Sequence, residues 1–415
     1  MTGRGTVFRG AREGRPFWVN LLNASLGPTA SWIRLSPEAL ARRGRRAAEE
    51  AGVEGLAFVD EWATLLEAIE SEADLHWLGR VAARQETLRL MQTQTRTRRA
   101  LDDRPSQEAR PMAPLIILGW PRTGSTHLLG LLSRDPANRA LPYFESFDPV
   151  APRGRDDRIE RVDSMLRFVE ALAPGYSAIH PMQGSDPEEC VAIFMLAFRT
   201  LQFDIQYRVP SYVRWLRESD PLPAHRFHRD VLQWIESQRP EDERWLLKDP
   251  THMLSFDALV SLHPGARFIH LHRDPSEAIA SICSLYAHTR AMFSDAVDPL
   301  ALGPEILDGY WGDGLDGLLE ARRRHPEVPV ADLRYEDLRR DPVAAIESAY
   351  ATLELALSQE AREEIRVHAA GHPQHAQGRH RYSLERFGLC ESRIQERFGA
   401  YAQRFGLDEA SSPTS

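Results

Sequence analysis

The stretch "PLIILGWPRTGSTHLLGLL", residues 114–132, restricts the possible fold more than any other part of the sequence. It opens with a short apolar run of the kind that a strand buried on both faces of a parallel sheet requires. A glycine-containing turn, "GWPRTGST", then leads into a predicted helix. Strand, turn and helix in this order match the phosphate-binding loop G-x-x-x-x-G-K-[ST], except that Ser125 stands where the lysine is expected.

Three later apolar runs have the same character as the first. They are "RWLLK" (244–248), "ARFIHLH" (266–272) and "VPVADLRY" (328–335). Most of the four runs are followed by a plausible helix start, which is typical of alternating strands and helices. We therefore predict an α/β fold, with a P-loop-like parallel central sheet flanked by helices.

The chain divides into an N-terminal part and a main domain. Residues 1–110 predict a helical N-terminal extension, because their apolar residues recur at helical spacing. A proline-rich break at 104–114 leads into the predicted α/β domain, 111–408. Within it, 155–240 predicts a helical insertion that covers the active site, although plain packing on the sheet would explain the same helices. The last residues, 409–415, predict a disordered tail.

The overall charge and the cysteines exclude several classes of protein. The net charge of −9 disfavours nucleic-acid binding, so an anionic ligand has to be held by a local cluster of donors. Cys190, Cys283 and Cys390 show no C-x-x-C spacing, which indicates neither a disulfide framework nor a zinc site and favours a reducing, cytoplasmic setting. No run of about 18 apolar residues occurs, so we expect no transmembrane segment. The oligomeric state stays open.

The glycine-containing turn predicts a site for an anion. Gly124 lets the backbone close around a ligand, and the hydroxyls of Thr123, Ser125 and Thr126 add donors to the backbone amides. Arg122 supplies charge through a guanidinium fork, which suits oxygens spread over two linked groups. A Mg²⁺-dependent nucleoside triphosphatase would also need a carboxylate at a strand end, where this chain has a lysine or an arginine. The loop therefore favours an anion handled without metal.

A second anion site is predicted in "HRDPSEAIAS", residues 272–281. Asp274 and Pro275 suit a helix start, so Arg273 lies at the corner between strand and helix and Ser281 lies about two turns into the helix. Both side chains can then face one phosphate at the carboxyl edge of the sheet. A surface pair of Arg273 with Asp274, beside an unrelated helix serine, is the alternative.

Together the two motifs resemble the paired signature of sulfotransferases that use 3′-phosphoadenosine 5′-phosphosulfate (PAPS). "RALPYFESFDP", "WLLKDPTHM" and "GRHRYSLERFGL" are similar to a bacterial branch of that family with a helical N-terminal extension. The resemblance implies that Arg122 contacts the phosphosulfate and that the amides from Thr123 to Thr126 hold the 5′-phosphate. It assigns the 3′-phosphate to Arg273 and Ser281.

The same resemblance implies further nucleotide contacts. "RYEDLRRDP" is similar to a later family strand whose tyrosine lies near the adenine, here Tyr335, and Arg379 and His380 are implied near the nucleotide. Tyrosylprotein sulfotransferases also carry arginine in the first loop, which accounts for the absent lysine. The implied co-substrate is PAPS, the implied product is adenosine 3′,5′-bisphosphate, and no metal is expected.

Lys248 is the only lysine of the chain and stands at the end of a predicted buried strand. A buried ammonium is costly unless it meets an anion, so we predict that it neutralises the leaving phosphate, and pairing with Asp249 or another carboxylate is the alternative. The resemblance offers two general bases. Glu145 stands 23 residues after Arg122, as a glutamate does in tyrosylprotein sulfotransferases, and it is preferred. His252 resembles instead the catalytic histidine of cytosolic sulfotransferases.

The sequence thus predicts a sulfotransferase that moves a sulfuryl group from PAPS to a small alcohol or phenol by in-line displacement. A lipophilic or secondary-metabolite acceptor, free or carrier-bound, is expected. Two alternatives stay open: an ATP-dependent kinase or nucleoside triphosphatase with a degenerate loop, and a nucleotide-binding protein without catalysis. The histidines between 368 and 380 favour a solvated loop over a metal site, because glycine and proline leave them no fixed helical face.

Overall fold

The structure is a computed structural model of the 415-residue chain. It describes Arg12, Gly55 and the following ranges: 14–53, 57–103, 112–174, 182–238, 243–371 and 383–407.

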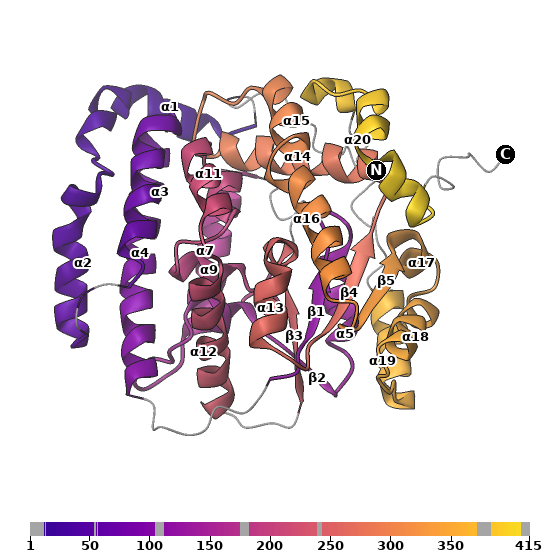
Figure 1. The fold of residues 1–415 in the computed structure, drawn as a ribbon. Coiled ribbons are helices and arrows are strands. Elements are labelled where there is room, and N and C mark those ends of the chain that lie inside the picture. The colour runs from indigo at the N-terminus through magenta and orange to yellow at the C-terminus, as the bar shows by residue number, and fades with distance from the viewer. Residues whose placement is uncertain are drawn as a thin grey trace.

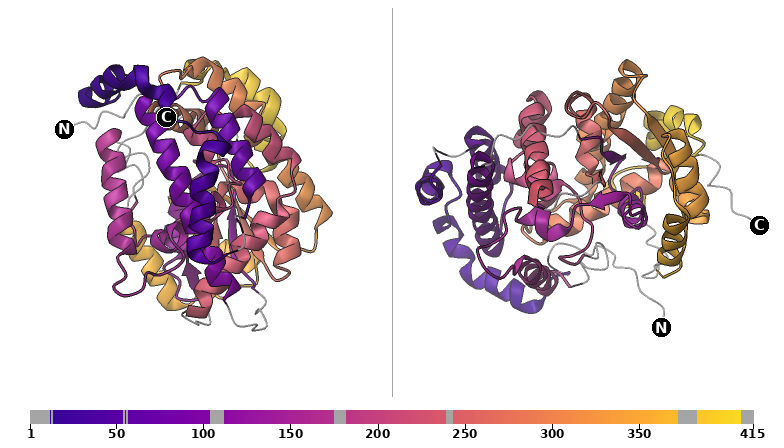
Figure 2. Two further views of the ribbon diagram at one scale, coloured as in Figure 1. Left: turned by 90° about the vertical axis from the view of Figure 1, so that its left-hand side faces the viewer. Right: turned by 90° about the horizontal axis from the view of Figure 1, so that it is seen from below.

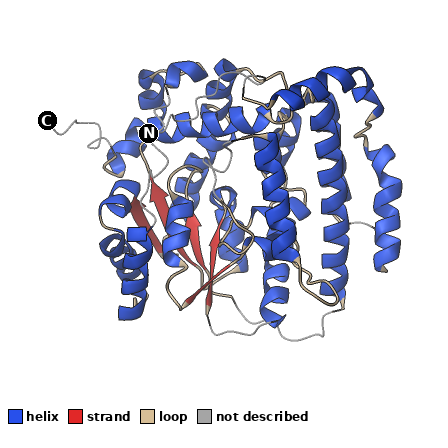
Figure 3. Cartoon of the chain, turned by 180° about the vertical axis from the view of Figure 1, so that it is seen from behind, coloured by secondary structure: helices blue, strands red, loops and turns tan. Residues whose placement is uncertain are grey.

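The described residues form a five-stranded, fully parallel sheet with the strand order β2-β3-β1-β4-β5 (Figure 3). The central strand is β1, in which Ile116 lies opposite Leu247 of β3 and Phe268 of β4. The predicted parallel α/β sheet is confirmed, and each of the four apolar runs contains a strand. The strands are β1 (Leu115–Leu118), β2 (Asn138–Ala140), β3 (Arg244–Lys248), β4 (Arg267–His272) and β5 (Val330–Arg334).

Side chains of β1 alternate between two hydrophobic cores, one on each face of the sheet. Leu115 and Ile117 belong to the first core, and Ile116 and Leu118 to the second. Because a strand with apolar residues on both faces is stable only when both faces are covered, this alternation explains why β1 reads as a continuous apolar run. Four helices line the first face: α5 (Ser125–Leu132), α17 (Tyr335–Arg340), α18 (Pro342–Thr352) and α19 (Gln359–Gly371).

The second core is much larger and takes in most of the other helices. Several of its helices start with an aspartate cap: in α14, Asp274 accepts a hydrogen bond from the amide of Glu277 at 2.9 Å, as the sequence predicted. The helices that contribute to this core or lie beside it are α6 (Tyr143–Phe147), α7 (Arg158–Leu172), α9 (Val191–Leu196), α10 (Gln202–Gln206), α11 (Pro210–Glu218), α12 (Leu222–Gln238), η2 (Pro250–Ser255), α13 (Phe256–Leu262), α14 (Pro275–Ala291), α15 (Pro299–Leu307), α16 (Tyr310–Arg324), η3 (Leu384–Phe387) and α20 (Glu391–Arg404).

Helices of the N-terminal part stand along one side of the molecule (Figures 1 and 2). Between them and the sheet lie α9, α11 and α12. Leu65, Leu90 and Met91 belong to the same core as Ile116 of β1, so these helices share the hydrophobic core of the sheet. They are α1 (Phe17–Leu26), η1 (Gly27–Trp32), α2 (Pro37–Ala51), α3 (Val59–Glu72) and α4 (Trp77–Asp102).

Among the described residues, no helix combines the length and the apolar character that crossing a membrane would require.

Candidate active site

The loop between β1 and α5 makes a tight turn at the carboxyl edge of the sheet. Its backbone takes positive φ angles at Gly119 (136°), Arg122 (69°) and Gly124 (92°). A Cβ atom on Gly124 would come within 2.6 Å of the Tyr335 ring, so only glycine fits there. Gly124 is the N-cap of α5, and the first amides of this helix have no partner within it. Such a helix start is suited to an anion.

The two predicted anion motifs meet in the structure. Nε of Arg122 donates a hydrogen bond to Oγ of Ser281 at 3.1 Å, which joins the loop to α14. Arg273, at the end of β4, donates from Nη1 to the carbonyl oxygen of Arg122 at 2.6 Å. Nε and Nη2 of Arg273 donate to Glu277, in the first turn of α14. The arginines and the serine therefore lie in one continuous group of donors.

Tyr335, next to β5, packs against this group of donors. It follows β5 directly, and the Arg273 guanidinium lies over its ring at 4.6 Å from the centroid. Its ring also packs against Gly124, so one side chain contacts both predicted anion motifs. Since all strands are parallel, the ends of β1, β4 and β5 come together at one edge, where α/β proteins bind ligands.

The hydroxyl residues of the loop differ in exposure. Thr123 is buried, and its hydroxyl donates to the carbonyl oxygen of Trp120 at 2.8 Å, so it stabilises the turn itself. Ser125 is also buried, whereas Thr126 is exposed. Trp120 packs edge-on against Phe398 of α20, with ring centroids 4.9 Å apart. Helix α20 therefore packs against the loop through this aromatic contact.

Lys248, at the end of β3, lies beside the loop. Its ammonium is almost completely buried, and Nζ lies 3.3 Å from Oγ1 of Thr126. The carboxylate that pairs with it is Glu189, just before α9. Asp249, the neighbour in sequence, caps η2 by accepting hydrogen bonds from the amide and the hydroxyl of Thr251. Burial and then the Glu189 charge raise the pKa of Asp249.

Glu189 was missed by the sequence analysis. It belongs to the acidic pair Glu188-Glu189 in "DPEEC", immediately before an apolar helix. Acidic residues at a helix start are usual for electrostatic reasons alone, so this position carried no distinctive signal. Only the fold brings its carboxylate to Lys248, 59 residues later in the sequence.

The two base candidates lie in different surroundings. Glu145 is a buried residue of α6, a short helix that packs against α9. His252, on η2, has no exposed surface, and its ring packs edge-on against Phe194 at 5.6 Å between centroids. Burial lowers the pKa of His252 well below its usual value, which makes it a weak base. Arg379 and His380 lie outside the described residues.

Comparison with known proteins identifies the class. The model of the Sulfotransferase family matches residues 114–359, which is more than half of the chain and includes β1, Lys248 and α14. The protein therefore belongs to the sulfotransferase family.

One curated relative and two solved structures from mycobacteria resemble the chain. The omega-hydroxy-beta-dihydromenaquinone-9 sulfotransferase of Mycobacterium tuberculosis is 24% identical over 308 residues, which cover 71% of this chain and 75% of the relative. The crystal structure of sulfotransferase STF9 from Mycobacterium avium gives a TM-score of 0.77 at 25% identity and covers 88% of this chain and 96% of its own. The crystal structure of sulfotransferase STF1 from Mycobacterium tuberculosis gives a TM-score of 0.72 at 27% identity. The match covers 86% of this chain and 98% of the STF1 chain.

Proposed function

We propose that this sulfotransferase takes its sulfuryl group from PAPS and transfers it to the hydroxyl of a small lipophilic molecule. The observation that carries the proposal is the continuous group of donors formed by Arg122, Ser281 and Arg273. PAPS presents a 5′-phosphosulfate and a 3′-phosphate on one nucleotide. Two adjoining sets of donors at one edge of a parallel sheet suit such a doubly anionic ligand.

Each part of the donor group then has its own role. The amides from Thr123 to Thr126, at the start of α5, hold the 5′-phosphate. Arg122 contacts the phosphosulfate oxygens, while Arg273 and Ser281 hold the 3′-phosphate. Tyr335 lies beside the adenine. This assignment is supported by the position of these residues, which all follow strands at the carboxyl edge of the parallel sheet or lie in the helices that begin there.

Lys248 is proposed to act on the leaving group. The acceptor oxygen attacks sulfur in line with the bond from sulfur to the bridging oxygen, and that bond breaks as the new S–O bond forms. The bridging oxygen keeps the electron pair and leaves as part of adenosine 3′,5′-bisphosphate. Arg122 and Lys248 stabilise the negative charge that develops there. In this step Lys248 gives up its contact with Glu189, and the contact of Lys248 with Thr126 supports its reach to the loop.

Glu145 is the proposed base, which takes the proton of the acceptor hydroxyl. Its spacing of 23 residues from Arg122, which resembles that of the glutamate in tyrosylprotein sulfotransferases, supports this role. His252 is less suited, since its ring is enclosed by other side chains and is a weak base. Glu145→Gln is expected to lower kcat by about 100-fold or more while the bisphosphate still binds. Glu67→Gln, a change on the exposed face of α3, is the control. Wild-type turnover in Glu145→Gln would exclude this role.

A lipophilic acceptor is favoured by the mycobacterial relative whose name specifies a menaquinone derivative. The test is incubation of the protein with radiolabelled PAPS and three acceptors: a long-chain alcohol, a hydroxylated menaquinone analogue and a phenol. We expect a labelled lipophilic product and a higher Tm with adenosine 3′,5′-bisphosphate. Stabilisation and turnover with Mg-ATP instead would favour the kinase alternative. Bisphosphate binding without a labelled product, even with host extract, would favour a binding protein without catalysis.

A further inference from the structure

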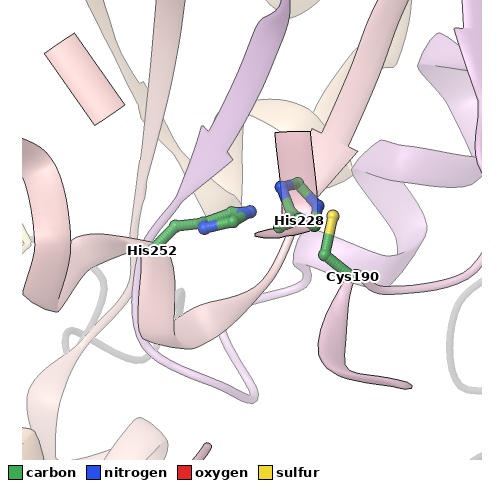
Figure 4. Close-up of side chains that lie close together, drawn as sticks. All are labelled: Cys190, His228 and His252. Atoms are coloured by element: carbon green, nitrogen blue, oxygen red, sulfur yellow. The ribbon is translucent and has the colours of Figure 1, made fainter. Parts of the chain in front are cut away.

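Three side chains with metal-binding atoms lie close together near the carboxyl end of β3. Cys190 precedes α9, His228 lies on α12 and His252 lies on η2, and none of them has exposed surface. Each offers one ligand atom, and these atoms all lie within 4.8 Å of one another. Figure 4 shows the thiol and the two rings directed toward a common space. Three separate elements thus supply one compact group.

The two imidazoles lack the hydrogen bonds that buried rings require. Within the part of the chain that the structure describes, neither ring nitrogen of His228 or of His252 has a hydrogen-bond partner. A neutral imidazole carries one donor and one acceptor, and leaving either of them buried without a partner destabilises the folded protein. The ring of Phe194 stacks on that of His228, with 4.9 Å between the ring centroids, and so presents apolar surface to this imidazole. A ligand that accepts nitrogen lone pairs would remove part of this cost.

A second group of potential metal ligands, His270, His272 and Asp332, differs because its members have hydrogen-bond partners. His272 bonds Tyr401 through Nδ1 and Asp332 through Nε2, and the Arg322 guanidinium contacts both Asp332 and His270. Their polar atoms are occupied, and a guanidinium repels a second cation. A metal ion therefore has no place in that cluster.

Further polar groups border the cysteine and the two histidines. Oδ2 of Asp249 and Nδ1 of His225 are buried and have no hydrogen-bond partner among the described residues. His225 precedes His228 by one helical turn, so both lie on the same face of α12, and its ring centroid lies 5.8 Å from that of His252. His225 thus stands beside the group, with a ring nitrogen available if its side chain moves toward the other three.

We propose that Cys190, His228 and His252 bind a zinc ion, with His225 or a water molecule in the fourth position. One thiolate and two imidazoles are a donor set that zinc prefers, and its bonds of about 2.0–2.3 Å require only small movements of these side chains. On binding, the Cys190 thiol releases its proton to solvent and the imidazoles bind as neutral ligands. This site goes against the sequence expectation of no metal.

The ion would tie the end of β3 to α9 and α12. The amide of Cys190 donates a hydrogen bond to the carbonyl oxygen of Lys248 at 2.9 Å, and Glu189 is the preceding residue. The zinc ion therefore lies behind the Lys248–Glu189 pair and takes no part in sulfuryl transfer. Its role is structural, and its presence is independent of the donor and acceptor proposed above.

Metal content is the first test. Protein from zinc-supplemented medium, desalted against a weak chelator, is expected to retain about one zinc ion per chain. Cys190→Ser is expected to lose most of it. Cys283→Ser is the matched control, because Cys283 is an equally buried free cysteine on α14, and it should retain the metal. A wild-type protein without zinc, or equal zinc in both variants, overturns the proposal.

Cobalt and heat supply readouts that do not depend on activity. The cobalt-substituted wild type and Cys283→Ser should show a thiolate-to-cobalt charge-transfer band, which Cys190→Ser should lack. Removal of zinc with a strong chelator should lower the wild-type Tm by more than about 5 °C. His228→Phe keeps the stacking on Phe194 and serves if Cys190→Ser fails to fold. Its Tm should not respond to the chelator, and a wild-type response in this variant contradicts the site.

Discussion

Arg122 and Ser281, which are 159 residues apart in the sequence, share a hydrogen bond of 3.1 Å between Nε and Oγ. The bond joins the loop that follows β1 to the second turn of α14. Arg273 also donates a hydrogen bond to the carbonyl oxygen of Arg122. The position of Arg122 therefore depends both on its own loop after β1 and on the residue that follows β4. A ligand that spans both motifs is expected to order all three residues together.

Arg122→Ala is expected to lower kcat/KM for PAPS by about 100-fold or more, since it removes preorganised donors from the developing charge. The stabilisation of the protein by adenosine 3′,5′-bisphosphate should also decrease. Arg122→Lys should recover only part of the activity, because an ammonium cannot bridge two oxygens as a guanidinium fork does. Radiolabel transfer and thermal shift measure both effects. Arg42→Ala, on the exposed face of α2, is the control, and equal rates for the two alanine variants would refute the assignment.

Gly124→Ala is expected to destabilise the protein by about 1–3 kcal/mol, because φ is 92° and the new Cβ would meet the Tyr335 ring at 2.6 Å. Bisphosphate binding should weaken as well. The matched control is Gly317→Ala in α16, where a Cβ meets no atom within 4 Å and helix propensity favours alanine. Urea denaturation should show the control unchanged or more stable. A Gly124→Ala protein as stable as the control would show that the loop tolerates a side chain there.

Glu189→Gln is expected to cost about 3 kcal/mol of stability, because it leaves the buried Lys248 ammonium without its carboxylate. Lys248→Met alone should cost less, and combining the two changes should recover most of the loss caused by Glu189→Gln. Urea denaturation of the four proteins forms a double-mutant cycle. Strictly additive losses would show that the two side chains do not interact. Transfer activity is expected to disappear in both variants with Lys248→Met.

Acid should destabilise the protein partly through Asp332. Burial by itself raises the pKa of this carboxyl, but hydrogen bonds from His272 and Arg322 lower it overall. A folded-state pKa below the unfolded value of about 3.9 stabilises the protein above that pH, and this stabilisation is lost as pH falls through the folded value. Asp332→Asn should therefore lower stability at neutral pH and flatten its decrease in acid. Denaturation between neutral pH and strong acid tests this, with the exposed Asp157→Asn as the control.

The sequence was sufficient to predict the sheet and the edge at which the two anion motifs meet. Apolar runs that must be buried on both faces predicted four of the strands, and the order of a strand, a turn and a helix placed Arg122 and Arg273 at strand ends. Carboxyl ends of parallel strands meet at one edge, so the convergence of the two motifs follows from local patterns. The short strand β2 was not predicted, because "NRA" at the sheet border carries no apolar pattern.

Tertiary structure decided which polar groups meet inside the protein. Glu189 reaches Lys248, and Cys190 reaches His228 and His252, across intervals that no helical or strand period relates. Cysteine spacing gave no sign of a metal site, because the three ligands come from three elements that only packing brings together. The sequence determined where strands and loops begin and end, since those depend on neighbouring residues. Contacts between distant side chains depend on how helices pack over the sheet, and local patterns do not encode that arrangement.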